Sequence, residues 1–131
     1  MKRFAALCMI TIFTINSFGQ VSVGVDVYNR YVWRGTDFSN TASIQPSLEY
    51  SIAGFTFGAW GAWAINGAAG GNENDLFVST QLGPVAVTFT DYFFPEYTGT
   101  DAILDLESHI FEASAGIELG PVSTLIALNV S

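Results

Sequence analysis

Arg30 and Arg34 are the side chains of this sequence whose type and spacing most directly suggest chemistry. They stand four residues apart in the segment YNRYVWRGTDFS and are the only basic residues after position 20, against twelve Asp and Glu residues. A planar guanidinium pairs with a carboxylate through two parallel hydrogen bonds, and opposed charges that line a pore set its ion selectivity. We therefore expect an internal ion-pair network, a charged pore lining, or both.

The expected partners of the two arginines are carboxylates elsewhere in the chain, namely Asp26, Glu49, Asp75 and Glu112. A separate role is open to Arg34, which precedes Gly35 at the predicted end of the first strand and could pin the first long loop. The candidate lumen and selectivity residues are Arg30, Arg34, Glu49, Asp75 and Glu112.

His109 is the only histidine, and Asp101, Asp105 and Glu107 lie close to it in the segment DAILDLESH. Their spacing matches no metal motif, so we expect a solvated histidine and no bound metal. No nucleophile is placed beside His109 as a catalytic pair requires, and the glycine-rich stretch GAAGGNEN has no lysine for a phosphate-binding loop. The sequence therefore predicts no catalytic residue, no cofactor and no enzymatic activity.

The chain has 131 residues, enough for one domain, and its first twenty read as a secretory signal peptide. A basic start at Lys2 and Arg3 leads into an apolar run over residues 4–15 and then the small residues of Ser17-Phe18-Gly19. Its removal takes away Cys8, the only cysteine, and leaves two arginines against twelve acidic residues, a formal charge of −10. This charge argues against nucleic acid as a partner.

From residue 21 onward the chain alternates apolar and polar residues, which is typical of strands with two different faces. The expected strands cover residues 21–34, 44–52, 55–65, 75–82, 85–94, 108–119 and 122 onward. In the first of them Tyr31 and Trp33 share the apolar parity, and both arginines lie opposite. Asp91 falls on the apolar parity of its strand, which indicates a β-bulge there.

The connections alternate between short turns, at 53–54, 83–84 and 120–121, and longer segments, at 35–43, 66–74 and 95–107. Strands of this length, short turns at one end and long loops at the other are the signature of an outer-membrane barrel. The fold class expected for residues 21–131 is all-β, an up-and-down antiparallel transmembrane β-barrel of about seven strands, incomplete in this chain. A soluble β-domain is the alternative, although such domains usually carry surface lysines and none follows position 20.

The segments YVWRGTDFS and IQPSLEYSIAGFTFGAWGAW resemble the start of the TorF-type porins, also filed as the gcw-chp family of bacterial outer-membrane proteins. The resemblance continues through NENDLFVS, YFFP and HIFEASAG, and covers about residues 21–119. It implies an outer-membrane barrel and names no solute. The positions that match the family's opening pattern are Tyr31, Arg34, Gly35, Ser39, Gln45, Tyr50, Gly54, Phe55, Gly58 and Trp60.

We accordingly expect a protein of the bacterial outer membrane that lets small solutes or ions diffuse passively through a polar lumen, with cations preferred. Its expected partners are outer-membrane lipid, the transported solutes and the barrel-assembly machinery. The sequence leaves open whether the protein forms a homo-oligomer. One alternative is a non-conducting structural or surface-recognition barrel that acts through its long loops, since small barrels are filled by side chains. Another is a soluble periplasmic binding domain.

Overall fold

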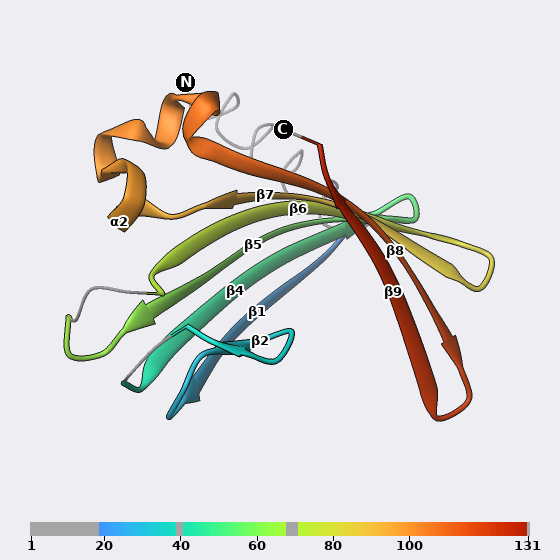
Figure 1. The fold of residues 1–131 in the computed structure, drawn as a ribbon. Coiled ribbons are helices and arrows are strands. Elements are labelled where there is room, and N and C mark those ends of the chain that lie inside the picture. Colours follow the sequence, from blue (N-terminus) through green and yellow to red (C-terminus); the bar gives the residue numbers. More distant parts are fainter. Residues whose placement is uncertain (1–18, 39–40, 68–70, 131) are drawn as a thin grey trace, which may run out of the picture.

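A computed structural model describes residues 19–38, 41–67 and 71–130. The predicted signal peptide therefore lies, up to residue 18, outside the described residues. Seven long strands form one antiparallel sheet in which each strand pairs with its neighbour along the chain, as the meander prediction required (Figure 1). The strands are β1 (Gly19–Tyr28), β4 (Ser43–Ile52), β5 (Phe55–Ala64), β6 (Glu73–Leu82), β7 (Val85–Phe93), β8 (His109–Leu119) and β9 (Val122–Asn129).

The two ends of the sheet differ in their connections. Tight turns after β4, β6 and β8 place glycine at positive φ, as at Gly54 (83°) and Gly83 (60°), a conformation that side chains disfavour. At the other end the chain makes longer connections. The segment expected as a loop after β7 holds three short helices instead: α2 (Pro95–Thr98), η1 (Thr100–Leu104) and η2 (Leu106–Ser108). No helix among the described residues is long and apolar enough to cross a membrane.

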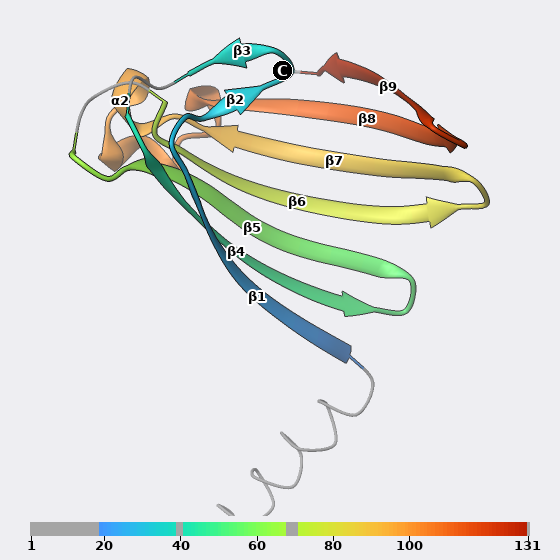
Figure 2. The same ribbon diagram turned by 90° about the horizontal axis from the view of Figure 1, so that it is seen from below.

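The first predicted strand is wrong beyond Tyr28. The chain leaves the sheet there and forms a small separate hairpin of β2 (Val32–Trp33) and β3 (Thr36–Asp37). Arg34 and Gly35 both have positive φ, 48° and 80°, the pattern of a type I′ hairpin turn. Figure 2 shows the hairpin crossing from the end of β1 over the sheet toward β8.

The sheet has a polar face and an apolar face, as the alternation predicted, but the apolar face is not the buried one. Every long strand carries at least one large apolar side chain on that face that is 43–75% exposed. Examples, one from each strand, are Val23, Leu48, Phe57, Leu76, Phe89, Leu119 and Ile126. The buried polar or charged residues of the described ranges are Ser43, Gln45, Glu73, Asp75, Thr90, His109 and Glu112, and the buried hydrophobic residues include Tyr31, Ala62 and Phe93.

One local prediction, the bulge at Asp91, is wrong. Asp91 does not form a bulge: β7 pairs without interruption with both β6 and β8, so Asp91 keeps its place on the apolar face. Pro46, which has no N–H to donate, lies in a gap in the strand pairing: the register of β4 with β5 skips Gln45 and Pro46. On its other side Pro46 lies opposite Val25 of β1.

Candidate functional site

Arg34 connects the β2–β3 hairpin to the middle of β8. Its Nη1 and Nη2 donate to the two carboxylate oxygens of Glu112, each at 2.9 Å, and the hydroxyl of Tyr92 donates to the same carboxylate at 3.1 Å. The guanidinium also stacks over Trp33, 4.1 Å from its ring centroid. Hydrogen bonding to Glu112 raises the pKa of Arg34. Arg34 thus pairs with a carboxylate of its own chain and pins the first loop.

Tyr31 anchors the other end of the hairpin on the same polar face. It is 5% exposed, its hydroxyl donates to Glu73 at 2.5 Å, and its ring packs against Phe38 and Trp60 with centroids 5.6 Å away. Burial, followed by the hydrogen bond to Glu73, raises the pKa of Tyr31. The predicted place of Tyr31 and Trp33 on the apolar side of the first strand is therefore wrong, because the chain leaves the sheet after β1 and both rings turn toward the polar face.

Asp75 lies between these two anchors, opposite Trp60 on β5 and Tyr92 on β7. The residue is 8% exposed, and its Oδ1 has no hydrogen-bond partner within the described part of the chain. A buried carboxylate oxygen without a partner costs free energy. Within the described residues, Oδ1 of Asp75 is therefore the buried side-chain oxygen that has no hydrogen-bond partner, while the Asp75 carboxyl also bonds to Glu73.

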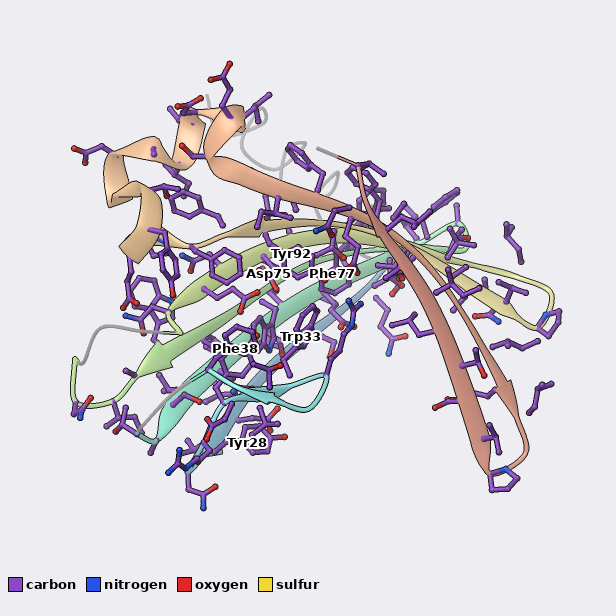
Figure 3. The ribbon with its side chains drawn as sticks, in the orientation of Figure 1. Tyr28, Trp33, Phe38, Asp75, Phe77 and Tyr92 are labelled. Carbon is purple, nitrogen blue, oxygen red and sulfur yellow. The ribbon has the colours of Figure 1, made fainter. Side chains whose placement is uncertain are left out.

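A cavity of about 700 Å³ opens between the hairpin and the polar face of the sheet. In Figure 3 Asp75, Phe77 and Tyr92 lie together over the middle strands, with Trp33 of the hairpin beside them. The lining residues are Tyr28, Arg30, Tyr31, Val32, Trp33, Gln45, Trp60, Asp75, Phe77, Thr88, Thr90 and Tyr92.

The five candidate lumen residues do not form one cluster. Arg34, Glu112 and Asp75 surround the space between hairpin and sheet, whereas Arg30 pairs with Asp37 inside the hairpin at 2.5 Å, with both side chains at least 40% exposed. Glu49 sits farther along β4, opposite Gly58, and does not line the cavity. The ion pair of Arg30 is thus with Asp37, a partner that the sequence analysis did not expect.

The sequence reasoning missed several aromatic residues of this site. Phe77 lies on the polar parity of β6, beside Asp75 and Ser79, and Tyr92 shares the parity of Thr88 and Thr90 on β7. An aromatic residue among small polar ones on the inward parity was the available signal. This signal can be interpreted only when it is known that the hairpin covers the polar face of the sheet.

The described residues of the family pattern lie in the hairpin segment, along β4 and β5, and at the tight turn between those two strands. Gly35 and Gly54 make positive-φ turns, and a Cβ at Gly58 would stand 2.0 Å from the ring of Phe77. Trp60 lies against Tyr31 and lines the cavity. Ser39 lies outside the described residues.

A family model described as "Bacterial protein of unknown function (Gcw_chp)" matches residues 14–131. The chain belongs to the Gcw_chp family. No curated protein and no solved structure matches it. The Gcw_chp match covers the whole seven-stranded sheet together with the hairpin.

On the opposite face of this Gcw_chp chain, His109 is buried rather than solvated, which corrects the expectation. Its Nδ1 lies 2.7 Å from Asp91 Oδ1, and its Nε2 lies 3.1 Å from the carbonyl oxygen of Ile103 in η1. Both ring nitrogens are thus engaged, and Asp91 on the apolar face has His109 as a hydrogen-bond partner. The described residues contain no group of three or more His, Cys, Asp or Glu arranged to hold a metal.

Proposed function

We propose that this chain forms part of the wall of a β-barrel in the bacterial outer membrane, of the porin type that the TorF resemblance implies. The observation that supports this most is the inverted burial: apolar side chains are exposed along all seven strands on one face, and the covered face is polar. In water, burying such a face is strongly favourable, so a soluble sheet places it under a second layer. In a bilayer the hydrocarbon covers it.

The strand dimensions fit the same proposal. The long strands contain 8 to 11 residues, and a tilted strand needs about 9–11 residues to cross the hydrocarbon core. Short turns at one end of the meander and long connections at the other are the pattern of such barrels. In the proposed barrel the edge strands β1 and β9 pair with further strands, because unpaired backbone groups in lipid cost several kcal/mol each.

The polar face then lines a lumen through which small solutes or ions diffuse passively. Because acidic residues outnumber arginines twelve to two after position 20, the lumen favours cations. The test is to express the full-length protein with its own N-terminus, separate the membranes and record conductance in planar bilayers. We expect the protein in the outer-membrane fraction and a cation-selective current. Recovery without detergent, or an anion-selective current, would contradict the proposal.

The hairpin supports a second candidate, a barrel that does not conduct. It lies over the polar face and is fixed there by Tyr31 and Arg34, in the position of a plug. A filled barrel of this kind would act through its long loops. Conductance separates the two candidates: a plugged barrel stays silent as the wild type and conducts only after residues 30–38 are replaced by a short Gly-Ser linker, whereas an open pore conducts in both forms.

A further inference from the structure

The cavity beneath the hairpin is lined on its sheet side by aromatic rings from three adjacent strands. Trp60 of β5 and Tyr92 of β7 both lie opposite Asp75 of β6. Phe77 follows Asp75 on the same face of β6 and lies opposite Gly58. A Cβ at Gly58 would overlap the Phe77 ring, so the glycine gives this ring room to lie over the neighbouring strand.

The hairpin segment supplies further rings from the opposite side of the cavity. The ring of Trp33 meets that of Tyr92 edge to face, with centroids 6.0 Å apart, and Tyr31 packs against Trp60 at 5.6 Å. The cavity volume of about 700 Å³ is in the usual range for small-molecule sites, about 300–1,000 Å³. A ring-shaped ligand would therefore meet aromatic surfaces of both the sheet and the hairpin.

The charged side chains that line the cavity, Arg30 and Asp75, have partners within the chain. Arg30 pairs with Asp37, and the carboxyl of Asp75 bonds to that of Glu73. A hydrogen bond between two carboxyl groups contains a proton, and the hydroxyl of Tyr31 also donates to Glu73. The other oxygen of Asp75 is buried and is not reached from the cavity. A charged ligand would thus lose hydration without gaining an unpaired opposite charge, a cost that a neutral ligand avoids.

Uncharged polar groups stand among the rings of the cavity wall. They are the hydroxyls of Tyr28, Thr88 and Thr90 and the side-chain amide of Gln45, whose Nε2 donates to Ser43 at 3.1 Å. Each hydroxyl both donates and accepts, and the amide also has an accepting carbonyl oxygen. Thr90 is only 9% exposed. A ligand without hydroxyl groups would therefore displace water from these side chains and leave them unpaired, which costs free energy.

We propose that this cavity binds a neutral sugar in its pyranose form. A pyranose has two faces of C–H groups and a rim of hydroxyl groups. Its faces pack against rings such as those of Trp60 and Phe77, and its rim forms hydrogen bonds with Thr88, Thr90 and Gln45. A purely aromatic ligand would also stack, but it would leave the threonine hydroxyls without partners. Binding does not require a pore; its meaning as the class of diffusing solute rests on the proposed function.

The test is titration calorimetry on the full-length protein in a polyoxyethylene detergent, because glucoside and maltoside detergents would occupy a sugar site. The probe is methyl β-D-glucopyranoside, whose ring substituents are all equatorial, so that both faces present C–H groups. Sorbitol keeps the hydroxyl groups but has no ring, and methyl β-D-glucuronide keeps the ring and adds a carboxylate. We expect the glucoside to bind at least about tenfold more tightly than either of them.

Several results would overturn the proposal. Equal affinity for the glucoside and sorbitol would show that the ring faces are not recognised. Tighter binding of the glucuronide would show that the cavity selects a charge. Saturable binding of indole without saturable binding of the glucoside, or no saturable binding of any of these probes, would equally exclude a sugar site.

Two variants assign the binding to the cavity. Phe77→Leu removes one ring, and Thr90→Val removes one hydroxyl at nearly constant shape, so each should weaken glucoside binding several-fold. Phe57→Leu is the matched control for the first, because Phe57 lies on the apolar face of β5, is 50% exposed and does not line the cavity. Thr124→Val, at an exposed position of β9, is the control for the second. Wild-type affinity in Phe77→Leu would refute the placement of the sugar against these rings.

The outcomes for the pore and for the site can be told apart, because calorimetry and conductance are separate measurements. Conductance without glucoside binding supports the pore and overturns the site. Glucoside binding without conductance supports the site and leaves the pore contradicted.

Discussion

The two arginines of the hairpin make ion pairs of the same chemical type in different surroundings. Arg30 pairs with Asp37 seven residues away, and their side chains are 52% and 40% exposed. Arg34 pairs with Glu112 seventy-eight residues away, through two hydrogen bonds, and the carboxylate is only 5% exposed. Exposed pairs contribute little to stability, whereas removing one partner of a buried pair leaves a costly unpaired charge. Position, rather than residue type, decides what each arginine does.

Arg34→Ala should cause the largest loss of stability. It leaves the buried carboxylate of Glu112 with only the Tyr92 hydroxyl, and it releases the tip of the hairpin. We expect a loss of about 2–3 kcal/mol, toward the low end for a buried pair because the Arg34 side chain is 38% exposed. Urea unfolding in detergent micelles, followed by tryptophan fluorescence, measures it. A loss no larger than that of Arg30→Ala would remove the distinction between the two pairs.

Double-mutant cycles sharpen the same comparison, because they isolate the pairwise interaction from other effects of each substitution. Alanine replacements at Arg34 and Glu112 should give a coupling energy of about 2 kcal/mol, and those at Arg30 and Asp37 less than about 0.5 kcal/mol. The same unfolding assay supplies all values. Equal coupling energies would show that burial of Glu112 does not strengthen its pair.

Tyr31→Phe should have an intermediate effect. It keeps the ring between Phe38 and Trp60 and removes the hydroxyl that donates to Glu73, so we expect a loss of about 1–2 kcal/mol. Stability should also respond to alkaline pH. Because the folded state raises the pKa of Tyr31 while the unfolded tyrosine titrates near about 10, ionisation favours unfolding above that pH.

Measured over pH 7 to about 11, the wild type should lose more stability than Tyr31→Phe does. Tyr97→Phe is a suitable control, because Tyr97 is 79% exposed. Parallel pH curves for wild type and Tyr31→Phe would contradict the role assigned to the buried hydroxyl.

Arg30→Ala should have the smallest effect, within about 1 kcal/mol at low salt. Salt screens exposed charges, so the difference from the wild type should shrink further at about 1 M NaCl, where the Debye length is only about 3 Å. The effect of Arg34→Ala should persist under the same conditions. Unfolding curves at both salt concentrations compare the two. A salt-insensitive effect of Arg30→Ala would show that the exposed pair is not simply screened.

Most of the sheet could be predicted from the alternation of apolar and polar residues. The seven long strands, their antiparallel order and the positions of the tight turns follow from period-two patterning and from Ala53-Gly54, Gly83-Pro84 and Gly120-Pro121. The hairpin could not be predicted from the sequence, because the apolar–polar alternation of β1 continues through Tyr31 and Trp33 although the chain has already left the sheet. Its turn at Arg34-Gly35 also lacks the Asn or Asp that usually marks a type I′ turn.

The candidate site could be predicted only in part, because the position of the hairpin was not predicted. Arg34, Glu112 and Asp75 were identified as charges of one face, and two of the three meet directly. The aromatic contacts of Trp33 and Tyr31 with the sheet depend on where the hairpin packs, and no local sequence pattern predicts that position. Asp91 is similar: its conflict with the apolar parity is resolved by His109, eighteen residues away, and by the cover of η1.

The distance along the chain between Arg34 and Glu112 has a consequence for the order of assembly. Each long strand pairs with its neighbour in sequence, so the meander can form one hairpin after another through local contacts. The link from Arg34 to Glu112 instead closes a loop of seventy-eight residues and cannot form until β8 is in place. Docking of the small hairpin is thus a late step, and the contact of the Trp33 ring with Tyr92 of β7, which requires docking, would report it through the fluorescence of Trp33.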